Sequence, residues 1–294
     1  MQAIGLLTEK LFGDNPKGLL YHYTTLTGLL GIVKDCTLWA SDIRYMNDSA
    51  ELKHSADLIR VEVQERIAKG QGKADLLGQF VDWVGNRITN GHLLFGASFR
   101  SHGNLLSQWR GYSAHGNGVS LGFSADYITE CAASQQFQIG KCIYEPEKQR
   151  KLISQVVDAV EAQVEITTKG PESRQELASI YRTVFESIEL DLLRIAAILK
   201  HPSFREEEEW RLVSPVYTNH TEAPLLFREA HAMLVPYVEF KLQQPGCPVR
   251  LDHLYLGPTS NINISMNSLR MFLQQKDIVP RKGIDYCQIP YRQR

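Results

Sequence analysis

Charged side chains at alternate positions make residues 207–213 the first candidate for chemistry. This segment reads EEEWRLV, and in an extended strand Glu207, Glu209 and Arg211 would point to the same face. Burying such charges costs several kcal/mol each unless they are paired, so this face is either solvated or part of a site. An arginine beside a carboxylate keeps it ionised, and an ionised carboxylate orients a hydroxyl or stabilises a developing cation. The alternative is a solvated edge strand with an acidic start.

A histidine and a threonine share one face of a predicted strand near the N-terminus. Residues 19–24 read LLYHYT, so His22 and Thr24 point the same way. The sequence then predicts a short helix over 26–33 and a second strand over 37–41. Such a strand–helix–strand unit with polar ends forms a cradle for a sugar or a nucleotide. The structural alternative for His22 is a partly buried histidine that is bonded to a backbone carbonyl.

Two aromatic side chains and two loops can likewise be interpreted either as parts of a binding site or as ordinary structural elements. Trp109 and Tyr112 lie about one helical turn apart and either offer a flat surface to a ring or belong to the core. Residues 114–118 form either a glycine-rich loop against a ligand or a hairpin turn. Asn47 and Asp48 either lie at the end of the cradle or cap the next helix.

The composition is that of an ordinary globular protein. The chain has 294 residues, of which 43% are hydrophobic and 22% charged, enough to bury a sizeable core. Its net charge of -1 supplies no global attraction for nucleic acid or for an anionic membrane, although a local basic patch at residues 141–151 would reverse that for nucleic acid. We expect no membrane-spanning helix and no signal peptide. The five cysteines are scattered, which favours free thiols in a reducing cytoplasm.

Motifs for several common cofactors and nucleophiles are absent from the sequence. It contains no HExxH and no CxxC, so a metal site is not expected. It also lacks GxGxxG and GxxxxGK[ST], which bind nucleotide phosphates, and the GxSxG of esterases. The expected site lies instead between the strand that carries His22 and the strand that carries Glu209.

The order of predicted elements indicates an α+β fold. Strand patterns occur near both ends, and helical patterns lie between them, the longest over about 146–168 and 173–199. This order favours a mixed or antiparallel sheet whose partner strands are far apart in the sequence, rather than regular βαβ units. We expect a single α+β domain over residues 1–294, with a helical insertion at about 146–199.

Several short motifs together resemble the bacterial domain-of-unknown-function family 2971. They span residues 19–291, and the family label by itself implies little chemistry. The motifs are YHYT, MNDSAE, SFR, QWRGYSAHGNGVSLGF, the spacing of Lys200, Phe204, Glu207, Glu209 and Arg211, and LYLGP with a following helix.

The opening YHYTTLTGLLGIVKDCTL more distantly resembles the H-x-T strand and helix of ADP-ribosyltransferases, especially those that modify nucleic acid bases. In that superfamily a strand histidine or arginine grips the ribose of NAD, an aromatic ring stacks on nicotinamide, and a glutamate late in a strand orients the reacting ribose. The resemblance implies an ADP-ribosyltransferase-like core. With the charged strand, the expected catalytic residues are Glu209 or Glu207 and His22, and the expected NAD-binding residues are His22, Thr24, Tyr45, Trp109, Tyr112 and Arg211.

The expected function is therefore transfer of ADP-ribose from NAD to a macromolecule, either a protein or a nucleic acid. Cleavage of the nicotinamide–ribose bond passes through an oxocarbenium-like state, so the site needs positioning and charge stabilisation more than a proton donor. The resemblance implies a cytoplasmic toxin or phage-defence effector, with a cognate antidote or defence-system partner. The alternatives are an NAD glycohydrolase, with water as acceptor, and a non-enzymatic domain that senses a nucleotide or a peptide.

Overall fold

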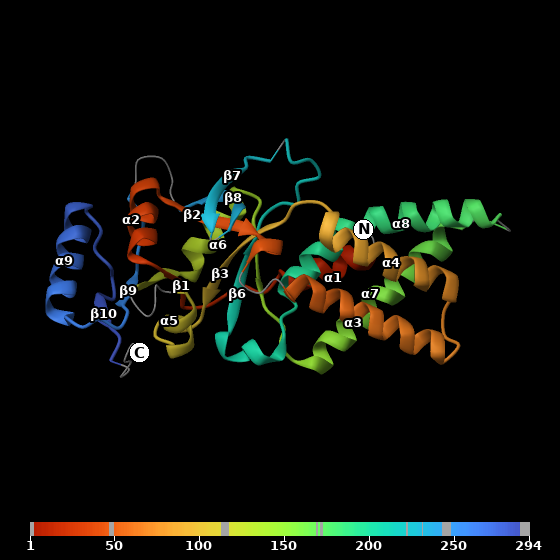
Figure 1. Ribbon diagram of the computed structural model, residues 1–294, viewed down its shortest axis with the longest axis horizontal. Helices are drawn as coiled ribbons and strands as arrows, with labels where there is room; N and C mark the ends of the chain where they lie inside the picture. Colours follow the sequence, from red (N-terminus) through yellow and green to blue (C-terminus); the bar gives the residue numbers. More distant parts are fainter. Residues whose placement is uncertain are drawn as a thin grey trace.

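The computed structural model has two parts along its longest axis (Figure 1). An open β-sheet and the helices near it form the left part of the view, and a bundle of helices forms the right part. The structure describes residues 3–46, 50–112, 118–168, 170, 173–221, 223–230, 232–242 and 248–288. The sheet is mixed, because β9 and β10 pair in parallel and the other paired strands are antiparallel. The predicted α+β class is confirmed.

Ten strands of the described residues form this one sheet. Most partner strands are far apart in the sequence, as predicted, because β1 pairs with β4 and β2 with β8. Strand β6 (Glu209–Val213) pairs with β3 and with β5 (Gln138–Lys141). The other strands follow the order β10 (Ile284–Tyr286), β9 (His253–Leu256), β4 (Val119–Ser124), β1 (Leu19–Thr24), β3 (Phe95–Arg100), β2 (Thr37–Asp42), β8 (Met233–Lys241) and β7 (Leu226–Ala230).

Strand β3 has three neighbours, and this opens a gap in the sheet. One edge of β3 pairs with β6 from Gly96 to Arg100. The opposite edge pairs with β2 at Gly96 and with β1 at Arg100. Strands β1 and β2 therefore diverge, and within the described chain the register gives Ala97 and Ser98 no strand partner on this edge.

Helix α2 (Leu26–Asp35) connects β1 to β2 across this gap. Its N-cap is Thr25, whose hydroxyl accepts a hydrogen bond from the backbone N–H of Gly28 at 3.0 Å. Gly28 also lets the helix lie against β1, because a Cβ at this position would collide with the side chain of Thr24. The sequence thus places the strand and the helix in direct contact at the gap.

The helical bundle has its own hydrophobic core, which includes Ile59, Phe80, Val156 and Phe185. Helices α7 and α8 occupy the stretch expected to be a helical insertion, and they pack with three further helices. The five members are α1 (Ala3–Leu11), α3 (Ala50–Ala68), α4 (Ala74–Asn90), α7 (Pro146–Thr167) and α8 (Arg174–Ile198).

A 3-10 helix, η2 (Pro202–Glu207), precedes β6 and corrects one prediction. Glu207 does not belong to the strand, because η2 ends at this residue and Glu208 has a left-handed φ of 41°. The segment begins at a proline and is capped by His201, whose ring accepts from the N–H of Ser203 at 3.3 Å. The remaining helical segments are η1 (Ile43–Tyr45), α5 (Leu106–Tyr112), α6 (Ala125–Ser134) and α9 (Ile262–Gln275). In the parts of the chain described above, no helix combines the length and the apolar character that crossing a bilayer requires.

Candidate functional site

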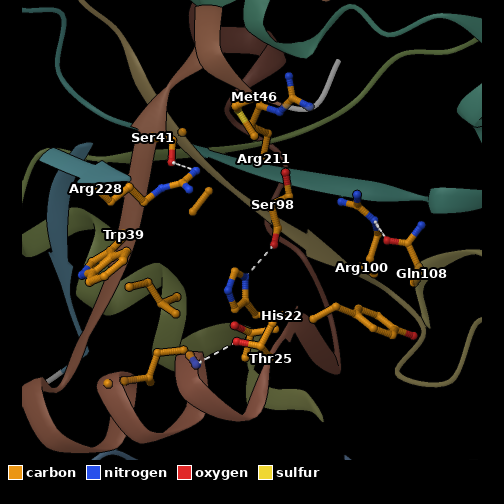
Figure 2. A pocket seen from close by; sticks show the side chains of 18 of the residues that line it. His22, Thr25, Trp39, Ser41, Met46, Ser98, Arg100, Gln108, Arg211 and Arg228 are labelled. Atoms are coloured by element: carbon orange, nitrogen blue, oxygen red, sulfur yellow. Dashed lines mark hydrogen bonds between the residues drawn. The ribbon is translucent and has the colours of Figure 1, made fainter. Parts of the chain in front are cut away.

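A cavity of about 510 Å³ lies where β1 and β2 diverge (Figure 2). Strands β1, β2 and β3 and helix α2 supply most of its wall, so the gap in the sheet and the connecting helix create the space together. Of the residues predicted from sequence, the cavity brings together His22, Thr24, Tyr45 and Arg211. Neither Glu207 nor Glu209 is among its lining residues.

The cavity wall is positively charged. Within the described chain, its charged side chains are Arg100, Lys200, Arg211 and Arg228, and no aspartate or glutamate accompanies them. Three of the four are almost fully buried, with exposed fractions of 2% for Arg100, 2% for Lys200 and 1% for Arg211. A cavity with such a wall favours an anionic ligand, because charges in a poorly solvated site interact strongly.

Two buried carboxylates that do not line the cavity contact the three buried cations. The Nζ of Lys200 lies 2.7 Å from Oε2 of Glu207 and 2.6 Å from Oε2 of Glu209. Arg100 donates to Glu207 at 2.9 Å and lies 3.2 Å from Glu209. The Nε of Arg211 donates to Oε1 of Glu209 at 2.8 Å. We call these five residues the charged cluster.

The antiparallel pairing of β3 with β6 brings much of the charged cluster together. Arg100 is the register partner of Glu209, and Ser98 is the partner of Arg211. The hydroxyl of Ser98 donates to Oε1 of Glu209 at 2.6 Å. Lys200 arrives from the end of α8 and is fixed through its backbone carbonyl, which accepts from the side chain of Gln149 at 2.7 Å. The alternative of a solvated edge strand is wrong, because β6 is paired on both edges and Glu209 is 0% exposed.

Glu209 stays ionised in this setting. Burial raises the pKa of its carboxyl, but the nearby charges of Arg211, Arg100 and Lys200 outweigh burial and hold the pKa well below 4.5. Both of its oxygens accept hydrogen bonds or contact cations. The geometry therefore suits Glu209 to hold the cations of the cavity wall.

The ring of His22 presents a hydrogen-bond acceptor to the cavity. Its Nδ1 lies 3.1 Å from the carbonyl oxygen of Ser98, which can only accept, so Nδ1 carries the proton. The second ring nitrogen, Nε2, has no hydrogen-bond partner among the described residues. Burial lowers the pKa of His22, the bond to Ser98 raises it, and Arg100 lowers it again, with a net decrease from 6.5. The imidazole is thus neutral near pH 7, and both interpretations of this residue fit its position.

The predicted aromatic residues separate into different environments. Tyr45 lines the cavity and is 42% exposed. Trp109 is 0% exposed and packs edge to face on Tyr23, with ring centroids 4.9 Å apart, so it belongs to the core rather than to the wall. Tyr112 closes α5, but its side chain lies outside the described residues. Trp39, which the sequence did not single out, lines the cavity.

Two of the sequence predictions fall on residues outside the described chain. Asn47, Asp48 and residues 113–117 lie outside the described chain. Sequence reasoning also missed the roles of Ser98 and Arg100, although their alternate positions in FGASFR put them on one face of β3. In the described residues, His, Cys, Asp and Glu side chains form no group of three or more that could hold a metal ion.

Residues 108–212 match a family described as Protein of unknown function (DUF2971). This match confirms the resemblance to that family over residues 108–212, which is part of the stretch 19–291 over which the motifs were found. The matched segment includes Lys200, Glu207, Glu209 and Arg211, and it ends before β7. No curated protein and no solved structure matches the chain.

Proposed function

We propose that the cavity binds a nucleotide through its phosphates and that this nucleotide is NAD. The observation that supports this most is the set of four cationic side chains that line the cavity. In the described chain no carboxylate lines the cavity with them, although Glu207 and Glu209 contact three of the four from outside the lining. Guanidinium groups bind phosphate oxygens through paired, charge-assisted hydrogen bonds. A volume of about 510 Å³ is within the usual range for small-molecule sites.

Polar side chains on the same wall suit the sugar of a nucleotide. Nε2 of His22 can accept a hydrogen bond from a ribose hydroxyl. The side chains of Thr24 and Thr27 line the cavity and can donate or accept. The role that the ADP-ribosyltransferase resemblance gives to His22, contact with ribose, is therefore compatible with its position.

The charged cluster prepares the site before any ligand arrives. Glu207 and Glu209 already fix Arg100 and Lys200 at hydrogen-bond distance. Side chains that are held in place lose little conformational entropy when a phosphate binds to them. Arg228 differs, because it reaches the cavity from β7 and belongs to no part of the charged cluster.

Calorimetric titration of the full chain with NAD, ADP and adenosine tests the proposal. We expect NAD and ADP to bind and adenosine, which has no phosphate, to bind at least tenfold more weakly, the size of a charge-assisted hydrogen bond. The variant Arg228→Gln should lose about tenfold in ADP affinity for the same reason. Arg182→Gln, on an exposed arginine of α8, is the control and should bind ADP as the wild type does. Equal affinities for ADP and adenosine would contradict phosphate recognition.

Transfer of ADP-ribose from the bound NAD is a second proposal, beyond binding. In this reaction the bond between nicotinamide and the ribose C1 breaks, and nicotinamide leaves with the electron pair as a neutral molecule. A hydroxyl or amine of a protein or nucleic acid bonds to C1 and releases its proton to water. Ser98 favours it, because its hydroxyl lies on the wall and connects to Glu209 at 2.6 Å. The carboxylate then acts on the ribose through Ser98. The predicted role as a toxin or phage-defence effector depends on this activity.

Incubation with NAD labelled in its adenosine part separates the possible activities. Label on a macromolecule supports transfer, free ADP-ribose supports an NAD glycohydrolase, and unchanged NAD with intact binding supports a domain that only senses the nucleotide. Ser98→Ala should lower turnover and leave NAD affinity within a few-fold of wild type. Wild-type turnover in Ser98→Ala would contradict a route through this hydroxyl.

A further inference from the structure

The indole of Trp39 is exposed where it lines the cavity. It stands in the middle of β2, a strand that pairs with β8 through this residue and Glu239, yet its side chain is 48% exposed. It also lines the cavity. The part of the ring that is exposed at the cavity is accessible to a planar group of a ligand.

The indole is also held in a fixed orientation. One side of it stacks on the ring of Tyr237, with centroids 4.6 Å apart and an angle of 29° between the planes. Tyr237 itself is 7% exposed, so it forms a buried support for the tryptophan. The accessible part of the indole is thus a rigid aromatic surface at the cavity.

A cation lies beside this surface. Arg228 lines the same cavity, and its Nη2 donates to the hydroxyl of Ser41 at 3.4 Å. Figure 2 shows Trp39 and Arg228 on one side of His22, with Arg100 on the other side. When a planar ring of a ligand stacks on Trp39, a phosphate of the same ligand therefore lies close to Arg228.

We propose that Trp39 is the surface on which the base of the bound nucleotide stacks. The proposal rests on the proposed nucleotide binding and adds the residue that makes the site prefer a nucleotide to a bare phosphate compound. Stacking on an aromatic side chain accepts any base, because every base has a π-face. Discrimination by Trp39 is therefore between ligands with and without a base, rather than between one base and another.

Titration of Trp39→Ala with ADP and with inorganic pyrophosphate tests this role. We expect the variant to bind ADP at least tenfold more weakly, as removal of a base–aromatic stacking contact predicts, and to bind pyrophosphate as the wild type does. Trp39→Phe keeps a ring at this position and should retain most of the ADP affinity. ADP should also quench the tryptophan fluorescence of the wild type more than that of Trp39→Phe, since Trp39 alone of the chain's four tryptophans is among the described residues that line the cavity.

The outcomes separate this inference from the proposal on which it rests. Unchanged ADP affinity in Trp39→Ala, or an equal loss for ADP and pyrophosphate, overturns the stacking role while nucleotide binding stands. If the wild-type chain binds neither ADP nor NAD, the proposed function fails and the inference fails with it. Unchanged pyrophosphate affinity in Trp39→Ala shows that the variant is folded.

Discussion

Two ionic networks in this molecule differ in burial and in the sign of their excess charge. In the helical bundle, Arg66 of α3 contacts Glu62 at 2.7 Å, Asp158 at 2.7 Å and Glu161 at 2.9 Å. These carboxylates are 14%, 64% and 21% exposed, so water screens the network. It has one cation and three carboxylates, and it ties α3 to α7.

The charged cluster in the sheet has the opposite character. It places three cations and two carboxylates where no side chain is more than 7% exposed. Burying charges in this way contributes little to stability, because desolvation offsets the attraction between the ions. The bundle network thus joins two helices, whereas the buried network keeps cations at the wall of a cavity. The predictions below test this difference.

The largest effect is expected for Glu209→Gln. The substitution keeps the shape of the side chain but removes its negative charge. Glu207 is then the one carboxylate left in the charged cluster, which still holds three buried cations. We expect the free energy of unfolding to fall by about 3 kcal/mol or more, as for breaking a buried ion pair. Urea unfolding followed by circular dichroism measures it. Glu207→Gln is the matched control, and an equal or larger loss there would show that Glu209 is not the centre of the cluster.

The contribution of Glu209 should also disappear in acid. Its pKa in the folded chain is held well below 4.5, so the unfolded chain binds a proton first as the pH falls. The stabilisation is complete above pH 4.5 and is lost progressively below it. The difference in unfolding free energy between the wild type and Glu209→Gln should therefore shrink as the pH falls below 4.5. A constant difference between pH 7 and pH 3 would contradict the assigned charge state.

A smaller effect is expected in the bundle. Arg66→Ala removes a partly exposed network and should lower the free energy of unfolding by about 1 kcal/mol. Its affinity for NAD should equal that of the wild type, because Arg66 does not line the cavity. Weaker NAD binding in this variant would remove the functional distinction between the two networks.

The smallest effect is expected at His22. His22→Ala removes one neutral hydrogen-bond acceptor from the cavity, so NAD affinity should fall by about threefold to tenfold. Because burial lowers the pKa of His22 from 6.5, wild-type affinity should change less through protonation of this ring between pH 8 and pH 6.5 than it would with an ordinary histidine at this position. Calorimetry at both pH values checks this. A variant that fails to fold would favour a structural role for the ring.

Much of the fold follows from local patterns. The sequence predicts the strand over 19–24 and the long helices α7 and α8, because their apolar spacing is regular. It does not reveal α6, which begins directly after β4 with only Ser124 as its cap. It also misses β7, whose residues are mostly exposed and lack a clear apolar alternation.

The candidate site is harder to predict from the sequence, because its contacts depend on the register in which the strands pair. Alternation correctly puts Glu209 and Arg211 on one face of β6. Glu207 reaches the same cluster through a 3-10 helix and a left-handed residue, which no strand pattern predicts. Arg100 meets Glu209 only because β3 pairs with β6 in one particular register. Whether Trp109 is buried or exposed is likewise decided by how α5 packs on β1.

The charge of the cavity and its shape depend on different elements of the fold. The sheet and the end of α8 supply the buried charges, whereas the ten residues of α2 supply much of the facing wall. Substitutions on the cavity side of this helix, such as at Gly31, which lines the cavity and where a Cβ would meet no atom within 4 Å, leave the ionic network untouched. Relatives with a different α2 would therefore accept ligands of a different shape, while the charged cluster that attracts an anionic group stays the same.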